Sequence, residues 1–160
     1  LAKEIEKQKL KAFMFRDFQS RNLQIHQDSV YMIDYQGGRR GPMLYDLVSL
    51  IYQASANLSP EFRGELKEEY KKEARKSVAI SDADFNHDFN SILFIRIIQT
   101  LGAYGFRGWI EKKPYFIESI PLALENLEML LNSEDFKVEI PYFIQLMKDT
   151  LKLKSKFAVN

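Results

Sequence analysis

Short apolar runs near the amino terminus contrast with longer helical repeats in the rest of the chain. Residues 23–25 and 30–33 are two apolar runs, and the polar residues Gln27, Asp28 and Ser29 separate them. This pattern predicts a small β-hairpin. Asn22 stands before its first strand and Asp34 just after its second, so the hairpin would bring the two side chains close together.

The helical pattern is strongest after the hairpin. A weak apolar stripe over residues 1–12 predicts the end of a helix. Three glycines, Gly37, Gly38 and Gly41, are expected to break regular structure, and Pro42 suits the first turn of a helix that residues 44–56 continue. From Pro60 onward an amphipathic surface helix is predicted, because four apolar residues recur at every fourth position: Phe62, Leu66, Tyr70 and Ala74.

The carboxyl-terminal part of the chain is predicted to hold the main core helix. Residues 89–104 are apolar nearly all round, which is typical of a buried helix, and glycines weaken its end. Pro114 restarts the chain toward a helix that Ser119 is expected to cap. A polar connector over residues 132–137 precedes a last helix from Pro141 to about Leu153.

Composition narrows the class of protein. A chain of 160 residues suffices for one core, so a single domain over residues 1–160 is expected. The net charge of +1 gives no electrostatic reason to expect nucleic acid or an anionic membrane as partner. Cysteine is absent, which excludes disulfides and thiolate metal sites and agrees with a reducing cytoplasm. No apolar run approaches the roughly 20 residues of a membrane span, so we expect a soluble, cytoplasmic protein.

Three side chains between residues 13 and 50 have a spacing that phosphoryl transfer can use. Asp17 is followed by Asn22 five residues later, and Asp34 comes after the predicted hairpin. In kinases a loop Asp accepts the proton of the acceptor hydroxyl, an Asn five residues on holds Mg²⁺, and a second Asp beyond a hairpin holds the bridging metal. Residue types, order and intervening hairpin all agree with that pattern.

Two longer segments resemble a known family. The segment FRDFQSRNLQI (residues 15–25), followed by MIDYQGGRRGPMLYDLVSL (residues 32–50), resembles the catalytic region of the aminoglycoside phosphotransferase and choline kinase superfamily. Within it, the chain is most similar to bacterial cell-wall-recycling kinases, which phosphorylate N-acetylmuramate and N-acetylglucosamine at the anomeric hydroxyl. Residues 101–105 and 120–124 also resemble the carboxyl-terminal helices of those enzymes.

The resemblance implies a fold and a set of site residues. The fold is mainly α: the carboxyl-terminal lobe of a protein-kinase-like fold, helical with one small β-hairpin that carries the catalytic and metal-binding loops. Asp17 would be the catalytic base and Asn22 and Asp34 the Mg²⁺ ligands, with ATP as phosphoryl donor. Arg16 and Asp46 would support the catalytic loop.

Each role has a structural alternative. Asp17 and Asn22 could cap turns, because Asp and Asn bond readily to nearby backbone N–H groups. Asp34 could end a strand as a turn residue. For Asp46 we favour the structural role, since it opens an apolar helix whose amino terminus stabilises a carboxylate. Gln36 is a candidate for substrate contact and could equally face solvent.

One residue departs from the family pattern. Phe15 stands where the family usually has His two residues before the catalytic Asp, a position that supports the loop by packing and hydrogen bonding. The resemblance also implies an amino-terminal lobe with a lysine and a loop for the nucleotide phosphates, and we expect this chain to be the carboxyl-terminal lobe alone. The chain is therefore expected to be inactive alone.

The sequence thus predicts a lobe of an ATP- and Mg²⁺-dependent small-molecule kinase that acts on an amino sugar. Two alternatives stay open: a pseudokinase or nucleotide-binding regulatory module without transfer activity, and a helical interaction domain that matches by chance. Aromatic residues near Trp109 could line a sugar pocket, although core packing is the more common use of such residues. The glycine-rich segment of residues 37–41 lacks the Gly-Lys-Ser/Thr that a phosphate loop requires.

Overall fold

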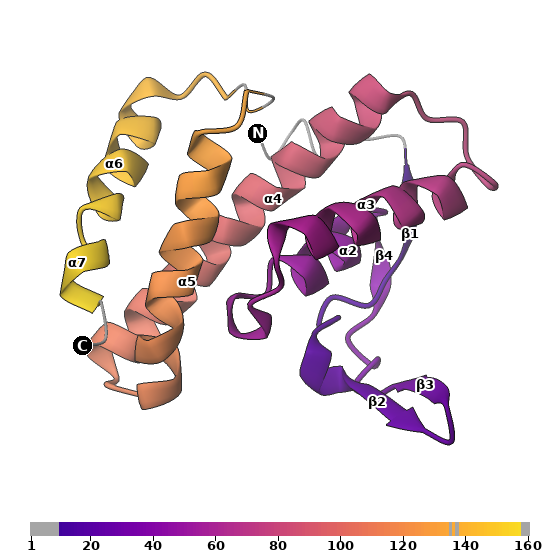
Figure 1. Ribbon diagram of the computed structural model, residues 1–160, viewed down its shortest axis with the longest axis horizontal. Helices are drawn as coiled ribbons and strands as arrows, with labels where there is room; N and C mark the ends of the chain where they lie inside the picture. The colour runs from indigo at the N-terminus through magenta and orange to yellow at the C-terminus, as the bar shows by residue number, and fades with distance from the viewer. Residues whose placement is uncertain (1–9, 135, 137, 158–160) are drawn as a thin grey trace. The chain divides into compact units, whose positions relative to one another are not determined.

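The computed structural model describes residues 10–134, 136 and 138–157 and is mainly helical, as predicted (Figure 1). Its residues group into two compact units, which divide between Leu93 and Phe94. The first unit holds all the described strands and the helices that precede α4, and the second holds the carboxyl-terminal helices. The helix α4 (Asp82–Tyr104) belongs to both units, because the division falls within it. This grouping does not test the expectation of a single domain.

The predicted β-hairpin is confirmed. Strand β2 (Leu23–His26) pairs antiparallel with β3 (Ser29–Met32), and Leu23 lies opposite Met32. The two residues of its turn, Gln27 and Asp28, have φ angles of 48° and 57°. Positive φ at both central residues is the conformation that matches the twist of a hairpin. The local turn therefore sets the pairing register.

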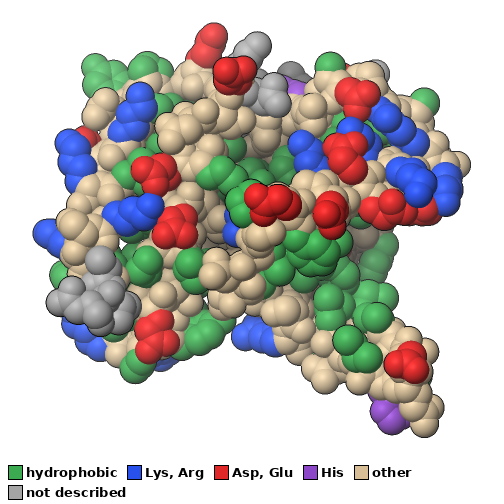
Figure 2. Space-filling view, in the orientation of Figure 1, with side chains coloured by type: hydrophobic (Ala, Val, Ile, Leu, Met, Phe, Trp, Pro, Cys, Tyr) green, Lys and Arg blue, Asp and Glu red, His purple; other side chains and the backbone are tan. Residues whose placement is uncertain are grey.

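The hairpin is formed without burial of its apolar side chains. All of its residues except Leu23 are exposed, and Ile25 is the most exposed apolar side chain among them at 80%. Hydrophobic side chains accordingly gather on its surface in the space-filling view (Figure 2). Backbone pairing and turn geometry, rather than core packing, therefore stabilise this hairpin.

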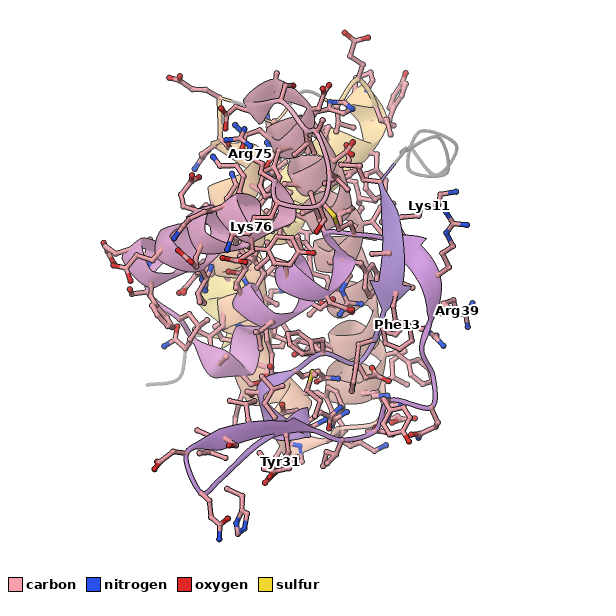
Figure 3. The ribbon with its side chains drawn as sticks, turned by 90° about the vertical axis from the view of Figure 1, so that its right-hand side faces the viewer. Lys11, Phe13, Tyr31, Arg39, Arg75 and Lys76 are labelled. Carbon is pink, nitrogen blue, oxygen red and sulfur yellow. The ribbon has the colours of Figure 1, made fainter. Side chains whose placement is uncertain are left out.

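A second small sheet was not predicted from the sequence. Strand β1 (Lys11–Met14) pairs antiparallel with β4 (Arg39–Pro42), and the two strands lie side by side (Figure 3). The predicted helix over residues 1–12 is wrong at Lys11 and Ala12, and its first nine residues lie outside the described ones. A pairing between segments this distant in sequence leaves no mark in local periodicity.

The same pairing overturns two expectations for the glycine-rich segment. Gly41 and Pro42 lie in β4 instead of breaking the chain and opening a helix. A side chain at Gly41 would come within 2.8 Å of the Met14 side chain, so glycine allows the two strands to pack closely. Pro42 is the last strand residue, a position where proline disturbs little of the ladder.

Helix α2 (Tyr45–Ile51) begins three residues after Pro42, and the short helix η2 (Ala54–Ala56) completes the predicted segment. The apolar face of α2 is buried at Leu47, Val48 and Ile51, and Leu44, which immediately precedes the helix, is buried with them. Helix α3 (Pro60–Ala74) confirms the predicted surface helix, since none of its residues is fully buried. The Ser59 hydroxyl accepts a hydrogen bond from the Phe62 N–H at 3.2 Å and caps the helix.

Helix α4 starts seven residues before the predicted core helix. The Ser81 hydroxyl accepts a hydrogen bond from the Asp84 N–H at 3.1 Å, which is the geometry of a capping residue. In the first unit α4 buries Phe85 and Phe89, and in the second it buries Phe94 and Ile97. Its role as a core helix is confirmed in both units.

The second unit consists of the end of α4, the π-helix η3 (Gly105–Ile110), α5 (Pro114–Leu131), α6 (Pro141–Leu151) and the short α7 (Lys154–Phe157). The predicted last helix is confirmed, although it ends at Leu151. The capping role expected of Ser119 is wrong, because Ser119 lies inside α5 and its hydroxyl donates to the Tyr115 carbonyl at 2.8 Å. The helix begins at Pro114, before the expected cap, and continues through Ser119. A buried stripe favours this one continuous helix: Ile120, Leu124, Leu127 and Leu130. No described helix has both the length and the apolar character to cross a bilayer.

Candidate active site

Asp17 lies on the loop that joins β1 to the short helix η1 (Ser20–Asn22), and η1 leads directly into the hairpin. The carboxylate is exposed, and its Oδ1 accepts a weak hydrogen bond from Gln19 Nε2 at 3.4 Å. The preceding residue, Arg16, has a φ angle of 76°, which is uncommon for a residue with a side chain. A loop in this conformation needs support from its surroundings.

Asp46 provides that support from the first turn of α2. Its Oδ2 accepts a hydrogen bond from the Phe15 N–H at 2.5 Å, and its Oδ1 accepts one from the Arg16 N–H at 2.9 Å. Both oxygens of one carboxylate therefore hold consecutive backbone amides just before Asp17. Hydrogen bonds to a charged acceptor are the stronger kind in proteins. The supporting role expected of Asp46 agrees with this geometry.

Asn22 closes the other end of the loop. Its side chain is 6% exposed, and its Nδ2 donates to the Asp17 carbonyl at 2.8 Å. Because the amide nitrogen is engaged with the loop, the amide oxygen Oδ1 is the atom that can act as a ligand to a cation. Asn22 thus holds the loop with its amide nitrogen and offers its amide oxygen to a cation.

Asp34 is brought to the same end of the hairpin. The Ile33 N–H donates to the Asn22 carbonyl at 3.0 Å, which extends the hairpin pairing by one residue beyond Leu23 and Met32. Asp34 follows with a φ angle of 65° and an exposed carboxylate. The sequence prediction that the hairpin places Asn22 and Asp34 near each other is therefore confirmed at the level of the backbone.

Gln36 contacts the carboxylate of Asp34. Its Nε2 donates to Asp34 Oδ1 at 2.5 Å, so the side chain orients the acidic group in this structure. Arg16 also reaches the segment after Asp34, because its Nη1 donates to the Gly37 carbonyl at 3.4 Å. The hydrogen bond from Arg16 thus connects the loop that carries Asp17 with the loop that carries Asp34.

Phe15 packs into the core at the position where the family usually has His. Its side chain is buried, and its ring meets that of Phe18 edge-on with the centroids 5.8 Å apart. Its backbone N–H is held by Asp46. The aromatic side chain therefore anchors the loop to the core by burial.

Two supporting residues escaped the sequence analysis. The Tyr70 hydroxyl, on α3, donates to the Met43 carbonyl at 2.7 Å, next to the start of α2. Burial, and secondarily the negative charge of Asp46, raises the pKa of Tyr70. Gln53 Oε1 accepts a hydrogen bond from the Ser20 N–H at 2.9 Å. Tyr70 occupied an ordinary place in the apolar stripe, and nothing in its local sequence marked it as a support of this site.

A metal at this site would rely on oxygen donors of two residue types. The described residues contain no group of three or more His, Cys, Asp or Glu side chains placed to hold a metal ion. The predicted pair, Asn22 and Asp34, combines an amide with a single carboxylate and is not such a group. Carboxylate and amide oxygens are nevertheless hard ligands that suit Mg²⁺, which usually binds one or two carboxylates and completes its shell with waters and phosphates.

Comparison with known proteins agrees with the geometry. The family model of the phosphotransferase enzyme family matches residues 1–80, which is half of the chain and includes every residue of the candidate site. No curated protein matches the chain.

Proposed function

Because the chain belongs to the phosphotransferase enzyme family, we propose that its candidate active site transfers the γ-phosphoryl group of ATP to a hydroxyl group of a small molecule in the cytoplasm. The observation that carries the proposal is the hydrogen-bonded frame around Asp17. Asp46 holds the loop before this residue, and Asn22 holds its carbonyl. Such a frame leaves the Asp17 carboxylate exposed on a fixed backbone.

Asp17 is the residue that accepts the proton of the acceptor hydroxyl in this proposal. Phosphoryl transfer needs little covalent chemistry from the protein and depends on positioning and charge stabilisation. A general base must reach the proton that it accepts, so an exposed carboxylate on a supported loop meets the geometric requirement. The proton moves from the acceptor oxygen to the carboxylate as that oxygen bonds to the γ-phosphorus and the bond between the γ-phosphorus and the departing ADP breaks.

Mg²⁺ is the metal that the donor set favours. Asn22 Oδ1 and the Asp34 carboxylate would hold it, and both are hard oxygen donors. The Nδ2 of Asn22 donates to the loop, which leaves the oxygen for the cation. When bound, the ion would neutralise charge on the nucleotide phosphates. Gln36 keeps the Asp34 carboxylate oriented through its hydrogen bond.

An amino sugar is the acceptor that we propose, and its support is the resemblance of residues 15–50 to cell-wall-recycling kinases. An amino-terminal lobe with a lysine and a covering loop would complete the nucleotide cleft. Screening the full-length protein with ATP and Mg²⁺ against amino sugars, aminoglycosides, choline and homoserine tests the acceptor class. Turnover of amino sugars alone would support the proposal, and preference for another class would replace it.

The test of the proposed function is the substitution Asp17→Asn in the full-length protein. We expect kcat to fall by about 10² to 10⁴ while nucleotide affinity stays nearly unchanged, since that range is typical of a general base. Turnover is measured by a coupled assay of ADP release and affinity by calorimetry. The matched control is Asp28→Asn, which removes an exposed carboxylate in the hairpin turn and should leave kcat unchanged.

Two results would contradict the proposal in different ways. An unchanged kcat in Asp17→Asn would exclude Asp17 as the base. Nucleotide binding without turnover of any acceptor by the unaltered full-length protein would instead favour the regulatory alternative, in which the fold binds ATP without transfer.

A further inference from the structure

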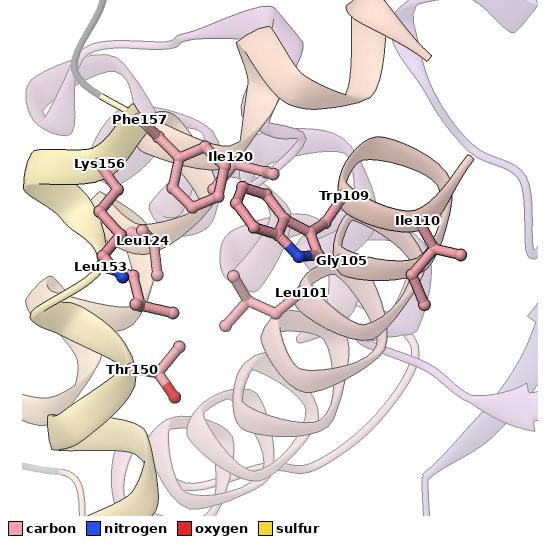
Figure 4. A pocket seen from close by; sticks show the side chains of 10 residues that line it. All are labelled: Leu101, Gly105, Trp109, Ile110, Ile120, Leu124, Thr150, Leu153, Lys156 and Phe157. Carbon is pink, nitrogen blue, oxygen red and sulfur yellow. The ribbon is translucent and has the colours of Figure 1, made fainter. Parts of the chain in front are cut away.

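The second unit contains a pocket of about 390 Å³ that the candidate active site does not use. Its walls come from four helical elements: α4, the π-helix η3, α5 and the α6–α7 segment (Figure 4). Known ligand pockets range from about 300 to 1,000 Å³, and a cavity of about 150 Å³ already holds benzene. The pocket therefore has room for a ring with substituents or for a medium-length alkyl chain.

The lining is almost wholly apolar. Ile120 and Leu124 are buried residues that line it, and the rings of Trp109 and Phe157 meet edge-on with centroids 5.6 Å apart (Figure 4). The polar atom of Thr150 is already engaged, because its hydroxyl donates to the Leu146 carbonyl at 2.8 Å. A ligand for this surface must be mainly hydrophobic.

The charge around the pocket is positive. Lys156 is the one charged residue among the described residues that line it, and none of these is acidic. A second ammonium group lies beside the same wall, because Lys112 Nζ sits 4.4 Å from the centre of the Trp109 ring. On α5, the carboxylates of Glu128 and Glu125 lie 2.7 and 4.0 Å from the ammonium group of Lys154, and none of the three residues lines the pocket. The charge that complements this arrangement is a single negative one.

Three residues of the π-helix line the pocket: Gly105, Trp109 and Ile110. Gly105 is the first residue of this helix, and a Cβ built on it would meet nothing within 4 Å. Single π-turns within helices frequently mark functional sites. The absence of a side chain at this position keeps the space open.

From these observations we infer that the pocket binds a small hydrophobic carboxylate, with its apolar body between Trp109 and Leu124 and its carboxylate toward Lys156. The inference rests on the second unit alone and does not depend on phosphoryl transfer. The sequence alone allows a sugar pocket near Trp109. An apolar lining without an acidic residue suits an alkyl or aryl acid better than a sugar.

The test uses Trp109, the single tryptophan of the chain, as the reporter. Decanoate is titrated into the 160-residue protein while tryptophan emission is followed, and calorimetry gives the stoichiometry. Decylammonium and decanol are matched probes of the same chain length with the opposite charge and no charge. We expect one decanoate per chain, a change in Trp109 emission, and binding of decylammonium at least about tenfold weaker.

Two pairs of variants locate the site. Gly105→Leu places a side chain in the pocket, whereas Gly102→Leu adds the same group three residues earlier, at an exposed position that is equally open and outside the lining. Lys156→Gln removes the charge at the pocket, and Lys148→Gln removes an exposed charge elsewhere on the same segment. We expect Gly105→Leu to abolish decanoate binding and Lys156→Gln to weaken it roughly two- to fivefold, as an exposed charge pair does.

The controls Gly102→Leu and Lys148→Gln should bind decanoate as the unaltered protein does. Decanoate affinity unchanged by Gly105→Leu would overturn the site. Equal affinity for decanoate and decylammonium would overturn the ligand class, as would a Lys156→Gln variant that binds decanoate and decanol as the unaltered protein binds them.

Discussion

At the scale of single residues, the site depends on a few polar side chains that hold backbone groups. Asp46 accepts two consecutive N–H groups, Asn22 donates to one carbonyl, and Tyr70 donates to another. Removing one partner of such a bond leaves a polar group unsatisfied, which costs more than the bond itself contributes. These residues are therefore expected to matter for stability and for the shape of the loop.

Asp46→Asn is expected to lower the free energy of unfolding by about 1–3 kcal/mol. The amide has one oxygen in place of two, so an N–H of Phe15 or Arg16 would face its NH₂ group. Urea denaturation followed by circular dichroism measures the change. Asp28→Asn should be neutral, because asparagine tolerates the positive φ of that turn position. Equal stabilities of the two variants would show that the Asp46 bonds contribute nothing.

Tyr70→Phe tests the link between α3 and the start of α2. Loss of the hydroxyl leaves the Met43 carbonyl without this donor and should lower the free energy of unfolding by about 0.5–1.5 kcal/mol near pH 8. The raised pKa of Tyr70 means that the unfolded chain loses this proton before the folded one does. Its contribution is therefore complete below pH 10 and is lost as pH rises through the folded pKa.

The difference in the free energy of unfolding between the unaltered protein and Tyr70→Phe should consequently become smaller as the pH rises above 10. Denaturation curves at pH 8, 9, 10 and 11 provide the measurement. Tyr31→Phe removes an exposed hydroxyl on β3 and serves as the control for a general effect of tyrosine loss. A difference that widens with pH would contradict the assignment of the raised pKa to the folded state.

At the scale of elements, tertiary burial overrides local helix signals. Helix α5 runs through Pro121, although proline has no N–H to donate and its ring disfavours the preceding turn. The buried stripe of Leu124, Leu127 and Leu130 beyond it compensates for that defect. Proline at position 114 is different, because the first helical position has no intrahelical partner for its N–H.

Pro121→Ala should therefore raise the free energy of unfolding by about 1–2 kcal/mol, part of the roughly 3 kcal/mol that proline costs in a helix interior. Pro114→Ala, the matched substitution at the helix start, should give no gain. Thermal and urea denaturation of both variants measure the contrast. A loss of stability in Pro121→Ala would mean that the packing of the proline ring outweighs the missing hydrogen bond.

At the scale of the whole molecule, helix α4 contributes to both compact units. It buries Phe85 and Phe89 in the first unit and Phe94 and Ile97 in the second. A helix is cooperative along its length, since each turn supports the next. Unfolding of one unit would expose part of the same helix to fraying, which favours a single transition.

Unfolding of the two units should accordingly coincide, as the proposed single domain requires. Trp109 emission follows the second unit. A Phe62→Trp reporter in a Trp109→Phe background follows the first, because Phe62 lies half-exposed on α3 and tolerates a larger ring. Equal urea midpoints for the two reporters would agree with one domain. The single domain would be contradicted if the two fluorescence reporters gave different urea midpoints while circular dichroism gave the same midpoint for both proteins.

The sequence by itself determined the local elements and the order of the chemical groups. The hairpin was predictable because its polar turn and two apolar runs are contiguous. Helix α3 was predictable from its apolar periodicity, α4 from a run that is apolar nearly all round, and the start of α6 from Pro141. The spacing of Asp17, Asn22 and Asp34 also indicated the chemistry, because a five-residue loop and a short hairpin are themselves local features.

Tertiary structure decided what joins segments far apart in the chain. The pairing of β1 with β4, the bonds from Asp46 to Phe15 and Arg16, and the reach of Tyr70 to Met43 each connect residues separated by about 25 residues or more. Local periodicity carries no record of such contacts, since their free energy appears only when the chain folds. For the same reason Gly41 became a strand residue and Ser119 the interior of a helix: burial against distant partners outweighed their local preferences.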